Sequence, residues 1–375
     1  MKILLISILK FGLRVLYAPI KLFKTKNRIV YLSRQSNDKS IDMLLLEKAI
    51  SNEMPGFEQV FRLRMIPDGF GEKIRYCAGI IGDMYYLATS KIAILDTYSI
   101  TVSCLNHKKE LKVIQMWHAL GAIKKFGLQS VGTKEGRDEK TSREMCMHKN
   151  YDFVIAPSKA SAVFYMEAFG YPADKMKICS LPRVDEILSD TGSSAKFYSL
   201  NPALLNKKII LYLPTFRDRE VQAAAQLKAD FTDIENDFHL IISPHPLFSK
   251  IKYDERYSYN GDFSTYDLMK IADVIVTDYS ACAFEASLLM KPLYFFVPDY
   301  KEYREERGLN VDLKAELPSA VFENAENLCR DIKSGNYDFN SLYKFKSKFV
   351  ENSNTNNAAV FAKFISMLAE KGGKA

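Results

Sequence analysis

The chain has 375 residues, enough for two α/β domains with full cores, and its 47% hydrophobic and 26% charged residues are ordinary for a soluble globular protein. Its net charge of +7 comes from 52 basic and 45 acidic residues, but seven of the basic residues and no acidic residue lie within positions 1–28. The other 45 basic residues balance the 45 acids, which excludes the basic face that a general nucleic-acid affinity requires.

Residues 1–27 are predicted to form an amphipathic helix at a membrane surface. Their uncharged runs are shorter than the roughly 20 residues that span a bilayer, and no cleavage site of a signal peptide follows. On a helical wheel the cations, among them Lys10, Arg14 and Lys21, form one stripe, and large apolar residues cover the rest. This pattern favours an anionic membrane surface as a partner. The alternative is a helix packed on the protein's own core.

Residues 28–188 are predicted to form a Rossmann-like domain that binds the acceptor. Short apolar runs predict strands near residues 28–33, 57–63, 92–95, 113–116 and 154–156. Helical patterns cover residues 42–51, 70–88 and 160–169.

A second alternation of strands and helices follows a less regular stretch, residues 189–208, which is predicted to be a linker. Strands are expected at residues 209–213, 240–243, 274–277 and 293–297, and helices near residues 220–229 and 283–290. Residues 209–350 would then form a second Rossmann-like domain, which binds the donor. Residues 351–375 are predicted to form a terminal helix, which in folds of this kind often crosses back to the first domain. The sequence thus predicts an α/β fold with two Rossmann-like domains facing across a cleft, the GT-B type of arrangement.

The strand at residues 274–277 runs into a polar turn, Asp278-Tyr279-Ser280, before the next helix. Ligands of open α/β sheets bind at the carboxyl ends of strands, and the first turn of a helix suits a phosphate. Residues 278–283 are therefore a candidate pyrophosphate site, with Asp278 expected to cap the helix and Ser280 to donate to the ligand. The alternative is a capped core helix that binds nothing.

Four sequence blocks occur in a fixed order. They are Gln115-Met116-Trp117-His118 with Lys124-Lys125-Phe126-Gly127, Leu213-Pro214-Thr215-Phe216-Arg217-Asp218, Ser243-Pro244-His245-Pro246, and residues 271–309. Together they resemble the CDP-glycerol glycerophosphotransferase family, the teichoic acid and capsule polyol-phosphate transferases. Two departures stand out. This chain has His118-Ala119-Leu120-Gly121 where many members read His-Gly-Thr-Pro, and Ala281 where many carry a second serine after Ser280.

The resemblance implies that His118 and His245 are catalytic. His118 would take the proton of the acceptor hydroxyl, a role that suits a side chain with a pKa near neutral. His245, held between two prolines, would face the donor pyrophosphate and stabilise or protonate the departing CMP. The alternatives are a satisfied structural histidine for His118 and a rigid loop histidine for His245.

Further residues are candidates for binding the two substrates. Arg217, Asp278, Ser280, Ala281 and Arg307 are predicted at the donor, because Arg and a helix N-terminus suit phosphate. Lys124 and Lys125 are predicted to bind a phosphorylated acceptor. Salt bridges and solvated turns are the alternatives for the basic residues.

No metal site is predicted, because CxxC, HExxH and DxD patterns are absent from the sequence, and no cofactor is firmly implied. The six cysteines show no paired spacing and suggest a cytoplasmic protein with reduced thiols.

The expected protein is a peripheral enzyme on the cytoplasmic face of the cell membrane. It would transfer glycerol phosphate or ribitol phosphate from CDP-glycerol or CDP-ribitol to a hydroxyl of a lipid-linked saccharide acceptor, releasing CMP. A GT-B glycosyltransferase that uses a nucleotide sugar is the nearest alternative, and a non-catalytic membrane-binding regulator is a more distant one.

Overall fold

The computed structural model describes residues 2–67, 69–134, 136–215, 231, 234–243, 263–351 and 356–371. The chain divides into two compact units. The first consists of Met1–His118, Phe126–Arg183 and Asn356–Ala375, and the second consists of Ala119–Lys125 and Val184–Thr355.

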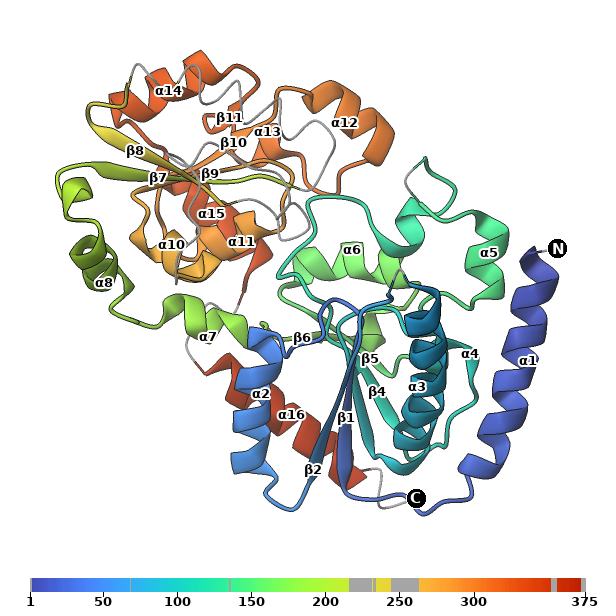
Figure 1. Cartoon of the computed structure of the whole chain (residues 1–375). Coiled ribbons are helices and arrows are strands. Elements are labelled where there is room, and N and C mark those ends of the chain that lie inside the picture. The colour runs from blue at the N-terminus through green and yellow to red at the C-terminus, as the bar shows by residue number, and fades with distance from the viewer. Residues whose placement is uncertain are drawn as a thin grey trace. The chain divides into compact units, whose positions relative to one another are not determined.

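The first unit is built on a parallel sheet with the strand order β2-β1-β3-β4-β5-β6 (Figure 1). The strands are β1 (Arg28–Ser33), β2 (Glu58–Leu63), β3 (Ile92–Leu95), β4 (Lys112–Gln115), β5 (Phe153–Ala156) and β6 (Met176–Ile178). Both β1 and β3 are buried along their whole length, as continuous apolar strands in parallel sheets are.

Helices surround this sheet, and local sequence signals set their ends. They are α1 (Lys2–Ile20), α2 (Ile41–Glu53), α3 (Phe70–Thr89), α4 (Ile100–Cys104), α5 (Glu139–Glu144), α6 (Lys159–Phe169) and α16 (Asn357–Lys371). Ser40 caps α2, Ser158 caps α6, and Gly170 ends α6 in the left-handed conformation at φ 72°.

The last helix belongs to the first unit although it ends the chain. On α16, Phe361 and Ile365 are fully buried, and the Phe364 ring lies edge-on to Phe153 of β5 at 5.3 Å between centroids. The terminal helix therefore packs on the β5–β6 side of the first sheet.

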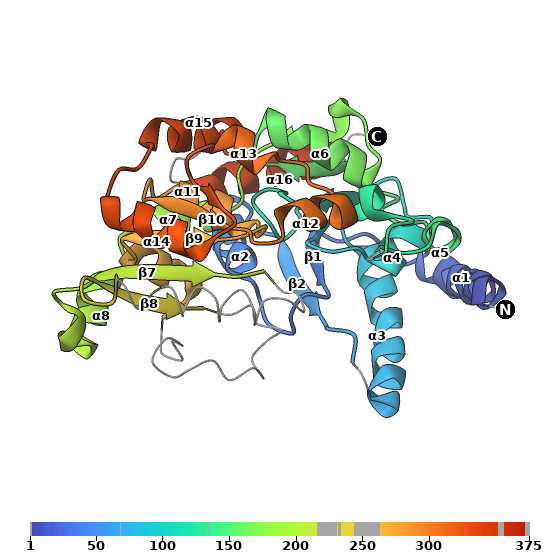
Figure 2. The ribbon, with the colours of Figure 1, turned by 90° about the horizontal axis from the view of Figure 1, so that it is seen from above.

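The second unit carries another parallel sheet, with the order β11-β10-β9-β7-β8. Its strands are β7 (Lys208–Leu213), β8 (Phe238–Ile242), β9 (Val274–Thr277), β10 (Leu293–Phe296) and β11 (Val321–Phe322). Its helices are α8 (Ser193–Leu200), α10 (Thr265–Ile271), α11 (Cys282–Ser287), α12 (Tyr300–Arg307), α13 (Leu313–Glu316), α14 (Ala325–Ser334) and α15 (Phe339–Phe349), with α7 (Arg183–Leu188) at the boundary. Figure 2 shows α14 and α15 of this unit from above, after a 90° turn from the view of Figure 1.

Two Rossmann-like units with parallel sheets confirm the predicted fold class, and the predicted strands lie within two residues of the observed ones. The helix expected near residues 220–229 lies outside the described residues.

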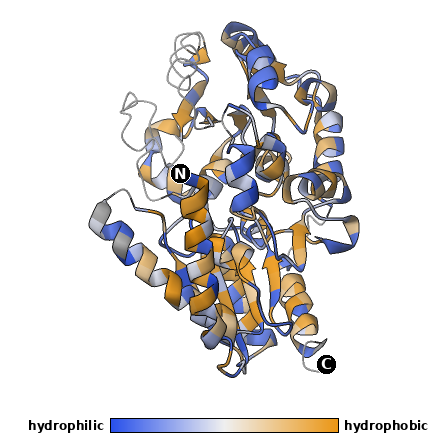
Figure 3. Ribbon diagram, turned by 90° about the vertical axis from the view of Figure 1, so that its right-hand side faces the viewer, coloured by the Kyte–Doolittle hydropathy of each residue, from blue (hydrophilic) through white to orange (hydrophobic). Residues whose placement is uncertain are grey.

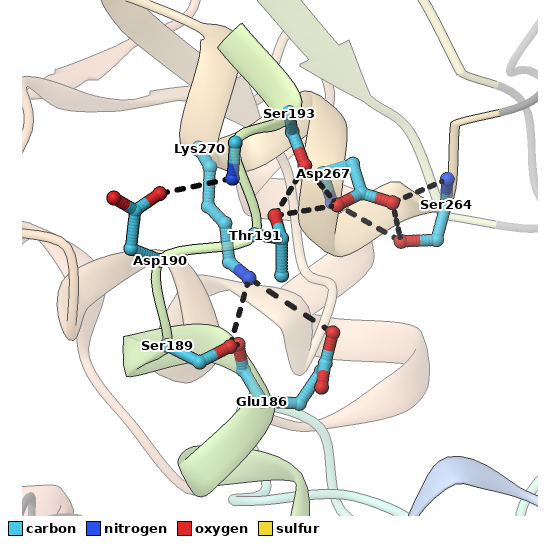
Figure 4. Close-up of polar contacts among 9 residues, drawn as sticks. Glu186, Ser189, Asp190, Thr191, Ser193, Ser264, Asp267 and Lys270 are labelled. Carbon is cyan, nitrogen blue, oxygen red and sulfur yellow. Dashed lines mark hydrogen bonds and ion pairs between the residues drawn. The ribbon is translucent and has the colours of Figure 1, made fainter. Parts of the chain in front are cut away.

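The stretch at residues 189–208 is more regular than expected, because it contains α8 and a 3-10 turn at Pro202–Leu204. A polar cluster ties its start to α10 (Figure 4). Asp267 accepts hydrogen bonds from Ser193 and from Ser264, and Lys270 pairs with Glu186 at 4.0 Å. The contacts of Ser193 with Asp267 and of Glu186 with Lys270 hold residues 186–193 against α10.

The N-terminal helix α1 lies along the outside of the first unit, next to α5 (Figures 1 and 2). Leu13 and Tyr17 are buried with Met84 and Ala88 of α3, and with Leu105. Tyr17 also shares a hydrogen bond of 2.9 Å with His107. One face of α1 is thus part of the protein's core.

Lys10 and Arg14 of the basic stripe face the protein, contrary to the prediction that the stripe faces lipid. Lys10 donates to the Glu144 carboxylate at 2.7 Å and to the Glu144 carbonyl at 2.8 Å, and its side chain is only 15% exposed. Arg14 donates to the Cys104 carbonyl at 3.0 Å, and Lys21 lies over the Tyr17 ring. The helical wheel separates the two faces of a helix, but the position of Glu144 in the folded unit decides which face turns inward.

The other face of α1 is apolar and exposed (Figure 3). Its large side chains are all more than half exposed: Leu4, Leu5, Ile8, Leu9, Phe11, Val15 and Leu16, followed by Leu22 and Phe23. By length and composition alone, α1 also meets the criteria for a helix that crosses a membrane, with a mean hydropathy of 1.8.

Candidate active site

The carboxyl ends of β1, β3 and β4 carry the candidate residues of the first unit. These strands are neighbours and parallel, so the residues that follow them meet at one edge of the sheet. Strand order reverses between β1 and β3, and such a switch point is where open α/β sheets bind ligands. Arg34 follows β1, Asp96 to Tyr98 follow β3, and Trp117 and His118 follow β4.

His118 is half-buried, and its ring orientation is set by one hydrogen bond. Its Nδ1 lies 2.8 Å from the backbone carbonyl oxygen of Asp96. A carbonyl can only accept, so Nδ1 carries the proton and the lone pair of Nε2 remains available. The pKa of His118 is lowered to about 4, chiefly by burial; the Asp96 hydrogen bond opposes this shift, and Arg183 lowers and Asp42 raises the pKa to smaller extents. His118 is therefore neutral at neutral pH and able to accept a proton at Nε2.

The residue before His118 has an unusual backbone. Trp117 has φ 63°, and its N–H donates to the Gln115 side chain at 2.9 Å. A residue other than glycine in this region costs on the order of 1–3 kcal/mol, and such positions cluster at functional sites. Gln115 is fully buried and also donates to the Thr97 carbonyl at 3.2 Å. The turn that presents His118 is thus held by Gln115, a residue for which the sequence suggested no role.

A buried ion pair stands close enough to influence His118. Arg183 donates to Asp42 through its backbone N–H at 2.7 Å and through Nε at 2.8 Å, and its terminal nitrogen also bonds that carboxylate. Asp42 is 1% exposed and lies in the first turn of α2, where the helix dipole favours a negative charge. No local sequence pattern links these two residues, because they are 141 positions apart in the chain.

A pocket of about 470 Å³ lies beside His118 within the first unit. Two histidines, two arginines and two aromatic side chains contribute to its wall: His118, His148, Arg34, Arg137, Tyr98 and Trp117. Met65, Ile66 and Met147 add apolar surface. Of these, only His118 was a candidate from the sequence.

In the second unit the equivalent switch point lies between β7 and β9. Asp278, after β9, is fully buried, and both its carboxylate oxygens accept from the Thr215 N–H at 3.0 Å. The Thr215 hydroxyl also donates to this carboxylate. Asp278 therefore joins the loops after β7 and β9. The prediction that Asp278 caps the next helix is wrong, because that helix has no side-chain cap.

The helix after this turn, α11, is shorter than predicted. It covers Cys282–Ser287, its N-cap residue is Ala281, and it has no side-chain cap. Ser280 is half-buried, and its hydroxyl accepts from the Cys282 N–H at 3.4 Å.

Gly121 explains part of the departure at His118-Ala119-Leu120-Gly121. A Cβ atom at Gly121 would lie 2.4 Å from the Phe284 ring of α11, so the ring leaves no room for a larger residue. Phe284 in turn stacks on Phe345 at 5.4 Å between centroids.

Lys124 and Lys125 lie beside the segment that follows Arg307. The Lys125 N–H donates to the Gly308 carbonyl at 3.1 Å, and Lys124 forms a β-bridge with Leu309. Both lysines belong to the second unit, although their positions fall within residues 28–188, the range predicted for the acceptor domain. The structure thus places the backbone of Lys124 and Lys125, predicted to bind the acceptor, beside the residues that follow Arg307, which was predicted to bind the donor.

Two candidates from the sequence, His245 and Arg217, lie outside the described residues. Among the described ranges, no group of three or more His, Cys, Asp or Glu side chains is placed to hold a metal ion.

A family model that matches most of the chain shows its family. Residues 16–366 match the family described as CDP-Glycerol:Poly(glycerophosphate) glycerophosphotransferase. The teichoic acid ribitol-phosphate primase of Bacillus spizizenii is 28% identical over 85% of both chains, and the teichoic acid glycerol-phosphate primase of Bacillus subtilis is 29% identical over 77% of both. The structure of the wall teichoic acid polymerase TagF superimposes with a TM-score of 0.73 at 18% identity, covering 100% of this chain and 98% of that one.

Proposed function

The chain belongs to the CDP-glycerol:poly(glycerophosphate) glycerophosphotransferase family, and we propose that it transfers glycerol phosphate or ribitol phosphate from a CDP-activated donor to a lipid-linked acceptor. The acceptor hydroxyl belongs to a saccharide, and the reaction serves teichoic acid or capsule-type polymer synthesis. The relatives named for glycerol-phosphate and ribitol-phosphate primases support both donors.

The protonation state and tautomer of His118 are the observation that carries this proposal. A neutral imidazole with Nδ1–H bonded to Asp96 has its Nε2 lone pair ready for the acceptor's hydroxyl proton. The hydroxyl oxygen then attacks the phosphorus atom that bears the polyol, and the phosphoanhydride bond to CMP breaks. The proton on Nε2 passes to solvent after the transfer.

The donor's pyrophosphate is proposed to bind in the second unit. Arg307, Lys124 and Lys125 supply positive charge there, and Ser280 and the backbone at Ala281 supply donors next to the β7–β9 switch point. Lys124 and Lys125 are thereby reassigned from acceptor to donor. Asp278 holds Thr215 in position and does not contact the donor itself. His245 and Arg217 remain proposed donor residues on the strength of the family resemblance.

A donor screen tests the reaction type. With a lipid-linked saccharide acceptor, CDP-glycerol or CDP-ribitol should yield CMP, whereas UDP- and GDP-sugars should yield no nucleotide. The larger kcat/KM of the two CDP donors identifies the polyol. Sugar transfer from a nucleotide sugar would contradict the proposal, and release of no nucleotide from any donor would indicate a non-catalytic protein.

Measurement of CDP-donor binding by variants tests where the donor binds. Arg307→Ala should weaken CDP-donor binding by about 1.5–3 kcal/mol, the usual contribution of a hydrogen bond to a charged group. Arg330→Ala, at a surface ion pair with Glu326 on α14, is the matched control and should leave the affinity unchanged.

The membrane contact is proposed to use the apolar face of α1. Leu13 and Tyr17 are packed in the core and Lys10 is paired with Glu144, so a helix lying on the bilayer keeps these contacts, whereas a crossing helix would break them. The proposed location is the cytoplasmic face of the membrane, with the exposed leucine, isoleucine and phenylalanine side chains of α1 in the interface.

Changing this face should release the protein from lipid. Fully burying a large apolar side chain contributes roughly 1.5–3 kcal/mol, so the triple variant Leu5→Gln, Ile8→Gln and Phe11→Gln should reduce binding to phospholipid vesicles by at least about a hundredfold. Sedimentation with vesicles measures this effect. Because Lys10 and Arg14 bind within the protein, added salt should weaken binding only slightly.

The matched control changes equally exposed apolar residues elsewhere: Val163→Gln, Leu200→Gln and Leu205→Gln. It should sediment as the unmodified protein does. If the α1 variant also remains bound, or if salt alone releases the unmodified protein, the apolar face of α1 is not the anchor.

A further inference from the structure

The pocket beside His118 contains positive charge that the described residues do not neutralise. The guanidinium groups of Arg34 and Arg137 lie 5.2 and 5.5 Å from the Tyr98 ring centroid. Neither forms an ion pair with any carboxylate in the described ranges of the chain. Both lie over the Tyr98 ring, and one terminal nitrogen of Arg137 donates to the Met145 sulfur at 3.5 Å. Stacking on a ring face leaves the other N–H groups at the guanidinium edges available.

Arg34 is held in place before any ligand arrives. Its backbone N–H donates to the Thr97 hydroxyl at 3.2 Å, which fixes it at the switch point between β1 and β3. Its side chain is half-buried, and its Nε is a buried atom with no hydrogen-bond partner among the described residues. An unsatisfied buried donor costs about 1–3 kcal/mol, so this atom gains from an acceptor in the pocket.

Neighbouring groups offer little negative charge to balance the two arginines. His148 is buried in the same wall, and its pKa falls to about 3 because of burial and then because of Arg137 and Arg34. His148 is therefore neutral and adds no further cation. Burial and Arg137 also lower the pKa of Arg34. An anion between Arg34 and Arg137 would relieve their mutual repulsion.

We propose that Arg34 and Arg137 form a binding subsite for a phosphate group of the acceptor, next to the hydroxyl that His118 deprotonates. The subsite deepens the proposed function and rests on it for the identity of the ligand. Paired guanidiniums suit phosphate because each can donate two parallel N–H bonds to its oxygens. The pocket that contains both arginines also contains His118, whereas the proposed donor residues lie in the second unit.

Direct binding tests the subsite without turnover. Calorimetry of the full chain with glycerol phosphate should detect binding, weaker binding of inorganic phosphate, and no binding of glycerol. Arg34→Met and Arg137→Met, which keep an apolar stem and lose the charge, should each weaken glycerol phosphate by roughly 10- to 100-fold. Arg75→Met, at an exposed arginine of α3, is the control and should bind as the unmodified protein does.

Kinetics then separates acceptor from donor. Arg34→Met should raise the KM for the acceptor and leave CDP-donor affinity unchanged. Comparison of an acceptor that ends in glycerol phosphate with one that has only its lipid pyrophosphate identifies the phosphate. A rise in KM with the first alone assigns the terminal group, and a rise with both assigns the pyrophosphate.

The two proposals fail in different ways. The subsite is overturned if both arginine variants bind glycerol phosphate as the unmodified protein does. It is also overturned if they weaken binding of the CDP donor instead of glycerol phosphate. Either result counts even if the protein releases CMP. Arginine-dependent binding of glycerol phosphate by a protein that releases CMP from no donor supports the subsite and contradicts the transferase.

Discussion

Replacing His118 by alanine is expected to lower kcat by roughly 10²- to 10⁴-fold, the usual contribution of a general base. The protein should remain folded, because among the described residues the side chain makes a single hydrogen bond, to the Asp96 carbonyl. His239→Gln, at a half-buried histidine of β8, is the matched control and should keep near-normal turnover. Near-normal turnover of the His118 variant would remove the assigned role.

The pH profile provides an independent check. His118 acts in its neutral form and its pKa is about 4, so kcat/KM should be level near neutral pH and fall as pH approaches 4. Bound phosphate adds negative charge, which raises the pKa of the imidazole. The acid limb of kcat should therefore lie at higher pH than that of kcat/KM.

The same pKa change affects stability. Folding lowers the pKa of His118 from 6.5, so its contribution to stability is fully present above that pH and is lost as pH falls toward 4.

Replacing Asp42 by alanine is expected to destabilise the first unit by about 3–5 kcal/mol, because it leaves the charge of Arg183 buried without its carboxylate. Asp42 is 1% exposed and Arg183 is 9% exposed, so water cannot take over the role of the carboxylate. Denaturant unfolding, followed by hydrogen exchange within the first unit, measures the change.

The double variant Asp42→Ala with Arg183→Met should recover much of this stability, since it removes the unpaired charge as well. Glu326→Ala is the control: it breaks an ion pair with Arg330 whose side chains are 65% and 69% exposed, and should change stability by less than about 1 kcal/mol. If the single variant Asp42→Ala is as stable as the Glu326→Ala control, the buried ion pair contributes little to stability.

Sequence alone determined most of the strands of this protein and the order of its motifs. Continuous apolar runs such as residues 28–33 and 274–277 can only be buried, and two alternations of strand and helix imply two Rossmann-like units. The amphipathic character of the N-terminal helix and the position of His118 after a strand were readable for the same reason: each depends on residues close together in the chain.

Only the tertiary structure decided which of these residues meet. Helix α1 has a basic face and an apolar face. The ion pair between Lys10 and Glu144 of α5 turns the basic face toward the protein. The sequence predicts that Asp278 caps a helix, but in the structure its carboxylate accepts a hydrogen bond from Thr215, 63 positions away. Arg34 and Arg137 share no motif, yet both line the pocket that contains His118. Local periodicity records the geometry of a single element, whereas these contacts depend on how strands and loops far apart in the chain are brought to the same sheet edge.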